Sequence, residues 1–141
     1  MFQNLKAMPG ILKWLTALTL VPPLFVLCTL IPNGSVKVYG SPMTNSAWWS
    51  CGAGVVVALL AVMMVVAEIL LLQRSKYSRP VFLIAMASTM LSGLPLEQLL
   101  EPKVTPPLWP TVFDLIPIAL MTWYLYASKA VQTYFHPKSF P

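Results

Sequence analysis

The sequence feature that most constrains the fold is the apolar run at residues 52–73, whose only charged side chain is Glu68. A helix of about 20 residues is long enough to cross the ~30 Å hydrocarbon core of a bilayer. The run ends at a short basic segment that extends from Arg74 to Arg79. It therefore predicts a membrane-spanning helix with a polar link behind it.

The composition also indicates a membrane protein. Hydrophobic residues make up 57% of the 141 residues and charged residues only 9%, against about 25% in an ordinary soluble domain. So few charged side chains cannot cover a surface that faces water, and we expect the exterior to face lipid. The formal charge of +5 does not indicate nucleic-acid binding, because the basic residues are spread between the apolar runs.

Four spans are predicted, at about residues 11–31, 52–73, 81–100 and 112–128. In the first, Pro22 and Pro23 predict a helix that is bent but not broken. The third contains several polar residues and follows Pro80, which suits the first turn of a helix. The fourth is predicted to start at a capping box, Thr111 to Asp114, which places the Asp114 charge at the helix N-terminus.

The first loop, residues 32–46, is polar and carries turn signals at Asn33-Gly34 and at Gly40-Ser41-Pro42. The β-prone stretch between them, residues 36–39, predicts a short strand or hairpin. The predicted fold class is an all-α integral membrane protein with a single domain over residues 1–141. Its four transmembrane helices are expected to form an antiparallel bundle, because short connections join consecutive spans.

Lysine and arginine residues predict the orientation. If the N-terminus is cytoplasmic, seven of the nine lie on the cytoplasmic side, and only Lys37 and Lys103 lie outside. Aromatic residues fall at both predicted interfaces, with Trp48, Trp49 and Trp109 on the outer side. We therefore expect both termini in the cytoplasm, and the expected location is a bacterial inner membrane.

Glu68 is the first candidate functional residue, because an ionisable group inside an apolar run costs at least about 2.5 to 3.5 kcal/mol near the bilayer centre and less toward the surface. It lies six residues before Arg74, which places it about 9 Å from the basic link and away from the centre. At helical spacing it shares a face with Val65, Ala61, Ala58 and Gly54, and we expect that face to be buried. Two interpretations remain. Glu68 is either a structural carboxylate, bonded to another helix or reaching toward a basic side chain, or a proton-coupled or ligand-binding group.

Two further candidates, Glu97 and Glu101, lie four residues apart and share a helix face. Thr89 and Gly93 continue that face inward as a strip of polar and small residues, which could line a water-filled path. In the alternative interpretation Glu101 pairs with Lys103 in solvent, Glu97 lies at the interface, and the strip is a helix contact.

The Trp48-Trp49 pair also has two interpretations. Tryptophans at this depth anchor a protein in the membrane interface, and tryptophans beside an ordered loop are common anchors for a protein partner. Cys28 and Cys51 are both expected near the outer face, where they form either a disulfide or two buried thiols.

No cofactor or metal site is expected, because the cysteines lack metal-ligand spacing and His136 is the only histidine. The sequence also lacks a nucleophile elbow, a phosphate-binding glycine loop and the zinc-protease motif. These features give no support for an enzyme.

In size, number of spans and basic cytoplasmic face, the chain is similar to immunity proteins that protect bacteria from membrane-acting toxins, and equally to accessory subunits of membrane complexes. This resemblance implies a non-enzymatic protein that binds another membrane protein through its helices and outer loops. Self-association is the other expected kind of partner. The alternative function is a small oligomeric transporter or channel that uses Glu68 and the strip of Thr89, Gly93 and Glu97.

Overall fold

The computed structural model describes residues 2–31, 33–38, 41–93, 96 and 109–135. The chain is mostly helical, with one two-stranded sheet in the described part. In chain order the elements are α1 (Phe2–Ala7), α2 (Gly10–Leu18), α3 (Val21–Thr29), β1 (Ser35–Val38), β2 (Ser41–Thr44), α4 (Asn45–Ser50), α5 (Ala53–Leu72), α6 (Ser78–Leu91), α8 (Trp109–Ala127) and α9 (Lys129–Phe135).

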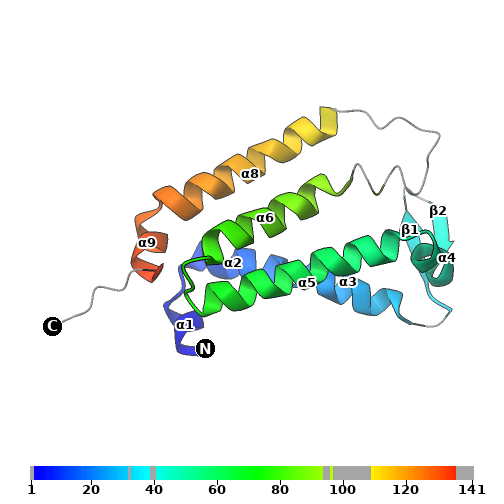
Figure 1. The fold of residues 1–141 in the computed structure, drawn as a ribbon, viewed down its shortest axis with the longest axis horizontal. Helices are drawn as coiled ribbons and strands as arrows, with labels where there is room; N and C mark the ends of the chain where they lie inside the picture. Colours follow the sequence, from blue (N-terminus) through cyan, green and yellow to red (C-terminus); the bar gives the residue numbers. More distant parts are fainter. Residues whose placement is uncertain (1, 32, 39–40, 94–95, 97–108, 136–141) are drawn as a thin grey trace.

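The long helices lie lengthwise and alternate in direction (Figure 1). The α2–α3 pair runs one way, α5 returns, α6 runs forward again and α8 returns. We call one end of the molecule the α1–α9 end, because both of those helices and the α5–α6 link lie there; the sheet and α4 lie at the other end, the hairpin end. The hairpin predicted for the first loop is confirmed.

Two helical stretches are long and apolar enough to cross a membrane, Gly10–Thr29 and Ala53–Leu72. They agree with the first two predicted spans to within two residues. The helix α6 has 14 residues and is about 21 Å long at 1.5 Å per residue, which is shorter than the hydrocarbon core of a bilayer. The described structure therefore supports two of the four predicted spans by length and composition.

The first stretch is interrupted, contrary to the prediction that it is bent but not broken. Its helix α2 ends at Leu18 and α3 begins at Val21, with Pro22 and Pro23 in its first turn. Thr19 and Leu20 keep right-handed helical dihedrals, so the chain continues in nearly the same direction. The break precedes the prolines because each missing N–H leaves a carbonyl without a donor four residues earlier.

The helix α6 begins at Ser78 and has Pro80 in its first turn, as predicted, but it ends at Leu91 and not near residue 100. The hydroxyl of Ser92 donates to the carbonyl of Thr89 at 2.6 Å, a local bond that competes with helical hydrogen bonding. The end of this predicted span, residues 97–100, lies outside the described residues.

The helix α8 begins at Trp109, three residues before the predicted start. Thr111 therefore lies inside the helix, and the predicted capping box with Asp114 is wrong. Pro110 accounts for the earlier start, because a proline is well suited to the first turn of a helix. The chain then continues beyond Ala127 into α9, a helix that was not predicted.

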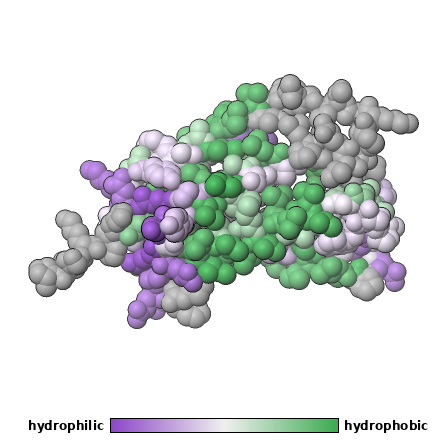
Figure 2. Space-filling model, viewed as in Figure 1, coloured by the Kyte–Doolittle hydropathy of each residue, from purple (hydrophilic) through white to green (hydrophobic). Residues whose placement is uncertain are grey.

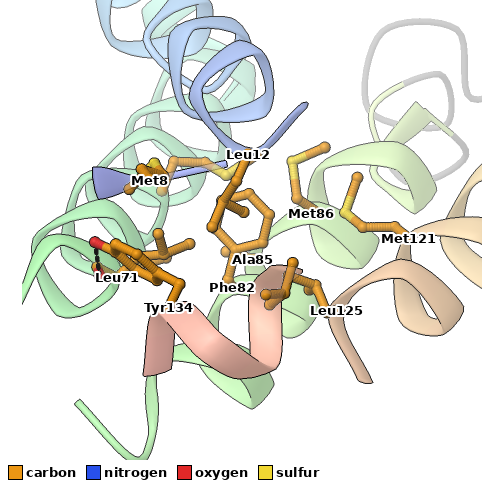
Figure 3. Close-up of a cluster of buried hydrophobic side chains, with 12 residues drawn as sticks. Met8, Leu12, Leu71, Phe82, Ala85, Met86, Met121, Leu125 and Tyr134 are labelled. Carbon is orange, nitrogen blue, oxygen red and sulfur yellow. Dashed lines mark hydrogen bonds between the residues drawn. The ribbon is translucent and has the colours of Figure 1, made fainter. Parts of the chain in front are cut away.

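A buried core lies toward the α1–α9 end, where side chains from α2, α5, α6, α8 and α9 point into a common centre (Figure 3). Phe82 and Leu12 are its largest fully buried members, with Leu71 and Leu125 beside them. Tyr134 closes the core and donates its hydroxyl proton to the Leu71 carbonyl at 3.3 Å. This core joins elements that lie far apart in the sequence.

The exterior between the two ends is strongly apolar (Figure 2). Many large hydrophobic side chains are exposed there, among them Leu59 at 66% and Trp123 at 67%. Hydrophilic side chains gather mainly toward the α1–α9 end, and a smaller group lies at the hairpin end (Figure 2). An apolar band between polar ends is the distribution expected of a protein surrounded by lipid.

Candidate functional site

Glu68 lies on the buried face of α5 and is only 7% exposed. Ala61 and Gly54 are buried on the same side of the helix, as predicted. Val65 is 37% exposed, so it does not belong to the buried face; Met64 and Ala67 take that place. The difference arises because a helix turn has 3.6 residues, and a buried face follows steps of both three and four.

Glu68 faces the break between α2 and α3. The hydroxyl of Thr19, which is 1% exposed, donates a hydrogen bond to Glu68 Oε1. Among the residues that the structure describes, Thr19 is the only hydrogen-bonding or ionic partner of this carboxyl group. The arrangement agrees with the interpretation of a carboxyl group bonded to another helix.

The break between α2 and α3 explains why the hydroxyl of Thr19 lies between two hydrogen-bond acceptors. The Leu20 amide donates to the Ala17 carbonyl at 3.3 Å, so it does not make the regular helical bond to Thr16. The Thr19 hydroxyl lies 2.8 Å from the Thr16 carbonyl and can take the place of that donor. Thr19 thus faces two acceptors, one on its own helix and one on α5.

A hydroxyl group has one proton to donate. If Glu68 is ionised, Thr19 satisfies either Glu68 or the Thr16 carbonyl, but not both. If Glu68 carries a proton, it donates to Thr19 Oγ1, and Thr19 donates to Thr16, so that all three groups are bonded. The site therefore offers a short hydrogen-bonded chain whose pattern depends on one proton.

Of the basic side chains toward which Glu68 could reach, Arg74 and Lys13 have other partners. Arg74 lies over the ring of Tyr134, with 4.5 Å from Cζ to the ring centroid. Lys13 donates to the Lys6 carbonyl at 3.1 Å. Glu68 is therefore a carboxyl group inside the helix packing and not one that reaches the polar link.

Trp48 and Trp49 lie in α4 at the hairpin end, where both pack within the chain. Trp48 is buried and meets Phe25 edge to face, with ring centroids 6.1 Å apart. Trp49 Nε1 donates to the Thr29 carbonyl at 3.3 Å, which supplies a donor at the end of α3. Gly52 makes the close turn into α5 with φ of 87°, a conformation that side chains disfavour.

A cavity of about 530 Å³ lies beside Trp49 at the hairpin end and is lined by the end of α3, the following turn and the start of α4. Asn45 holds this loop together. Its side-chain Nδ2 donates to the Ile31 carbonyl at 2.8 Å, and its backbone N–H donates to the Gly34 carbonyl at 3.1 Å. Asn45 Oδ1 is buried without a hydrogen-bond partner in the described part of the chain. The two bonds from Asn45 therefore fix the turn after α3 to the start of α4.

Of the three remaining acidic candidates, the structure describes only Asp114. Asp114 lies in the second turn of α8, and Glu97 and Glu101 lie outside the described residues. On the predicted polar strip, the Thr89 hydroxyl donates to the Ala85 carbonyl of its own helix at 2.9 Å. Gly93 follows the end of α6, so Thr89 and Gly93 do not share one face of that helix.

Cys28 and Cys51 are both free thiols. The structure brings together no group of three metal-ligating side chains in the residues that it describes. His136 lies beyond them.

Sequence reasoning missed Thr19 as the partner of Glu68. The prolines at 22 and 23 predict a disturbed turn at residues 18 and 19, but they do not indicate that the Thr19 hydroxyl faces Glu68. It also missed that Arg74 and Arg79 stack on aromatic side chains of α8 and α9. Those contacts join residues 47 to 60 positions apart, and no local pattern predicts them.

Comparisons with protein-family models, with curated proteins and with solved structures found no match to this chain.

Proposed function

We propose that this chain is a four-span membrane protein, with both termini in the cytoplasm of a bacterial cell, that binds another membrane protein and performs no catalysis. The apolar exterior supports insertion, and the seven-to-two distribution of basic residues supports the orientation. An immunity protein or an accessory subunit of a membrane complex would act in this way.

The observation that carries the proposal is the exposed first half of α8. Val112, Phe113, Leu115, Ile116 and Leu120 are each more than half exposed, whereas Met121 and Leu125, farther along, belong to the core. This half of the helix carries Asp114, for which the structure describes no ion pair. An acidic group within an apolar segment is costly in lipid and usually faces a protein neighbour.

The proposed partner is therefore a transmembrane helix of another protein, laid against the first half of α8. Small residues do not dominate this surface, so the contact would rely on large apolar side chains and on a polar group opposite Asp114. The ordered loop around Asn45 and Trp49 lies at the hairpin end, where it could add contacts outside the membrane.

Site-specific photo-crosslinking in the native membrane tests this proposal. A photoreactive residue at Ile116 should give one discrete adduct, because its side chain is on the exposed half of α8. The same residue at Leu59, which is exposed on α5, is the matched control for random contact with membrane neighbours. No adduct from Ile116, together with a lone monomer in mild detergent, would contradict the proposal.

A second candidate function, a small proton-coupled transporter or channel, is favoured by the hydrogen-bonded chain of Glu68, Thr19 and Thr16. A chain that can shift with one proton is a plausible element of a relay. Reconstitution in proteoliposomes distinguishes the two functions. A proton or ion flux that Glu68→Gln abolishes would favour the transporter or channel function. The absence of such a flux would exclude that function.

A further inference from the structure

A second cavity, of about 340 Å³, lies at the α1–α9 end beside the link between α5 and α6. We call it the basic cavity. Its lining consists of Arg74, Ser75, Lys76, Arg79, Pro80, Tyr126 and Phe135. Three of these side chains are cationic and none is acidic. The volume falls within the range of small-molecule sites, and the charge favours an anion.

Aromatic rings hold both arginines of the basic cavity. Arg74 lies over Tyr134, and Arg79 lies over Phe135 at 4.6 Å from the ring centroid. The more distant ring of Tyr126 is 5.9 Å from Arg79. A guanidinium group that stacks through its face keeps the donors along its edge, which match the two oxygens of a phosphate.

Some of these donors lack an acceptor. Arg74 Nε and Arg79 Nη2 are buried and have no hydrogen-bond partner within the described ranges of the chain. Buried polar groups are normally bonded, and an unpaired charged donor is the most costly exception. An oxyanion in the basic cavity would supply the missing acceptors.

The backbone of Arg74 gives an independent reason to expect a role for its side chain. Arg74 follows α5 with φ of 54°, in the left-handed region. The Ser75 amide donates to the Leu70 carbonyl and the Arg74 amide to the Leu71 carbonyl, which is the usual glycine-type helix end. Arginine is less favourable than glycine in this conformation, so the backbone at Arg74 is strained. Its side chain lines the basic cavity.

The position of the basic cavity indicates the source of the anion. The apolar stretch of α5 ends at Leu72, two residues before Arg74, so the cavity lies at headgroup depth once α5 crosses the bilayer. The first turn of α6, with Arg79 and Pro80, adds the positive end of a helix dipole. Basic pockets at this depth on the cytoplasmic side are suited to anionic lipid headgroups.

We propose that the basic cavity binds the phosphate group of an anionic phospholipid. The site rests on the proposed membrane insertion, but it does not depend on the proposed protein partner.

Native mass spectrometry of the full chain in mild detergent tests the site, with dioctanoyl phosphatidylglycerol and dioctanoyl phosphatidylcholine as probes. The anionic lipid should bind about tenfold more tightly, because its headgroup has a net negative charge, whereas phosphatidylcholine adds a quaternary ammonium that the three cationic side chains repel. Arg79→Gln and Lys76→Gln should each reduce that preference several-fold. Lys13→Gln, which removes an exposed cation outside the basic cavity, should retain it.

Lys76→Gln keeps the test valid if Arg79→Gln fails to fold, because the Lys76 side chain is exposed. Equal binding of the two lipids would overturn the proposal, and so would wild-type preference in both cavity variants. Inorganic phosphate that binds as tightly as the anionic lipid would assign the cavity to a soluble anion instead.

Alkaline carbonate extraction separates failure of this site from failure of the proposed function. Release of the wild-type chain from membranes would contradict the four-span proposal. Retention in the membrane without a preference for the anionic lipid would contradict the basic cavity alone.

Discussion

The hydroxyl of Thr19 on the first apolar stretch donates to the carboxyl group of Glu68, 49 residues later in α5. The bond is possible because the helix is interrupted at Thr19, where regular hydrogen bonding gives way. An interrupted helix beside an acidic side chain is uncommon in a membrane and is tolerated only where protein or water covers it. The relationship can be tested from both sides.

Thr19→Val should destabilise the protein more than Glu68→Leu. Valine removes the hydroxyl group that links Glu68 and the Thr16 carbonyl and leaves the buried carboxyl group without its partner, at a cost of roughly 1 kcal/mol or more. Leucine removes the carboxyl group, but Thr19 keeps the Thr16 carbonyl as an acceptor. The measurement is the midpoint of thermal unfolding in detergent for each single variant and for the double variant.

The double variant should recover part of the stability lost in Thr19→Val, because no buried carboxyl group is then left unpaired. Glu68→Gln should be close to neutral in stability, since glutamine keeps the shape and can itself donate to Thr19. Equal midpoints for Thr19→Val and the wild type would show that the hydrogen bond does not hold the two helices together.

Gly54→Ala should loosen the contact between α4 and α5. A methyl group at Gly54 would lie 2.6 Å from Trp49 Cδ2 and 3.1 Å from Trp48 Cδ1, so the indole rings would have to move. Overpacking of this kind costs typically 1 to 3 kcal/mol. Gly10→Ala is the matched control, because a methyl group there meets nothing within 4 Å. Tryptophan fluorescence should shift in the first variant only.

Arg74→Gly should be more stable than Arg74→Ala by about 1 kcal/mol, because only glycine adopts the left-handed conformation without strain. Both variants lose the stacking on Tyr134, so the difference between their stabilities reports the backbone strain at residue 74 alone. Unfolding midpoints of the two variants give the result. An alanine variant as stable as the glycine variant would mean that the end of α5 does not keep its left-handed residue.

Cysteine labelling tests the proposed topology and requires probe positions that are exposed to solvent. Ser78 is fully buried, so a cysteine there would resist reagent on either side of the membrane. Tyr77 and Ser46 are exposed and lie at opposite ends of the molecule. With Cys28 and Cys51 replaced by alanine, Ser46→Cys should react with an impermeant reagent in intact cells.

Tyr77→Cys should react only after the cells are opened. The opposite pattern would invert the proposed orientation, and labelling of both positions in intact cells would exclude a membrane between them.

The parts of the fold that follow from local pattern were predictable. The bounds of α5 follow from one long apolar run in which Glu68 is the only charge, and the start of α6 follows from Pro80. The hairpin follows from turn residues on both sides of a β-prone stretch. In each case a single segment of sequence contains the cause.

The parts that depend on distant contacts were not predictable. Glu68 was identified because a charge interrupts an apolar run, but its partner Thr19 depends on how two helices pack. The early end of α6 depends on competing hydrogen bonds from short polar side chains, whose outcome spacing alone does not decide. The basic cavity combines the α5–α6 link with aromatic residues of α8 and α9, which only the tertiary structure brings together.

The last turn of α5 is completed by residues from both sides of the sequence. Asn4 donates to the Leu72 carbonyl at 2.8 Å, and Tyr134 donates to the Leu71 carbonyl across a separation of 63 residues. Asn4 leaves the ribosome before α5, and the Leu71 carbonyl also accepts from the Arg74 amide, so the bond from Tyr134 is the contact that arrives last during synthesis. The α1–α9 end should therefore be the last region to mature, and a ribosome-bound chain stalled before α9 should exchange amide protons fastest at the end of α5.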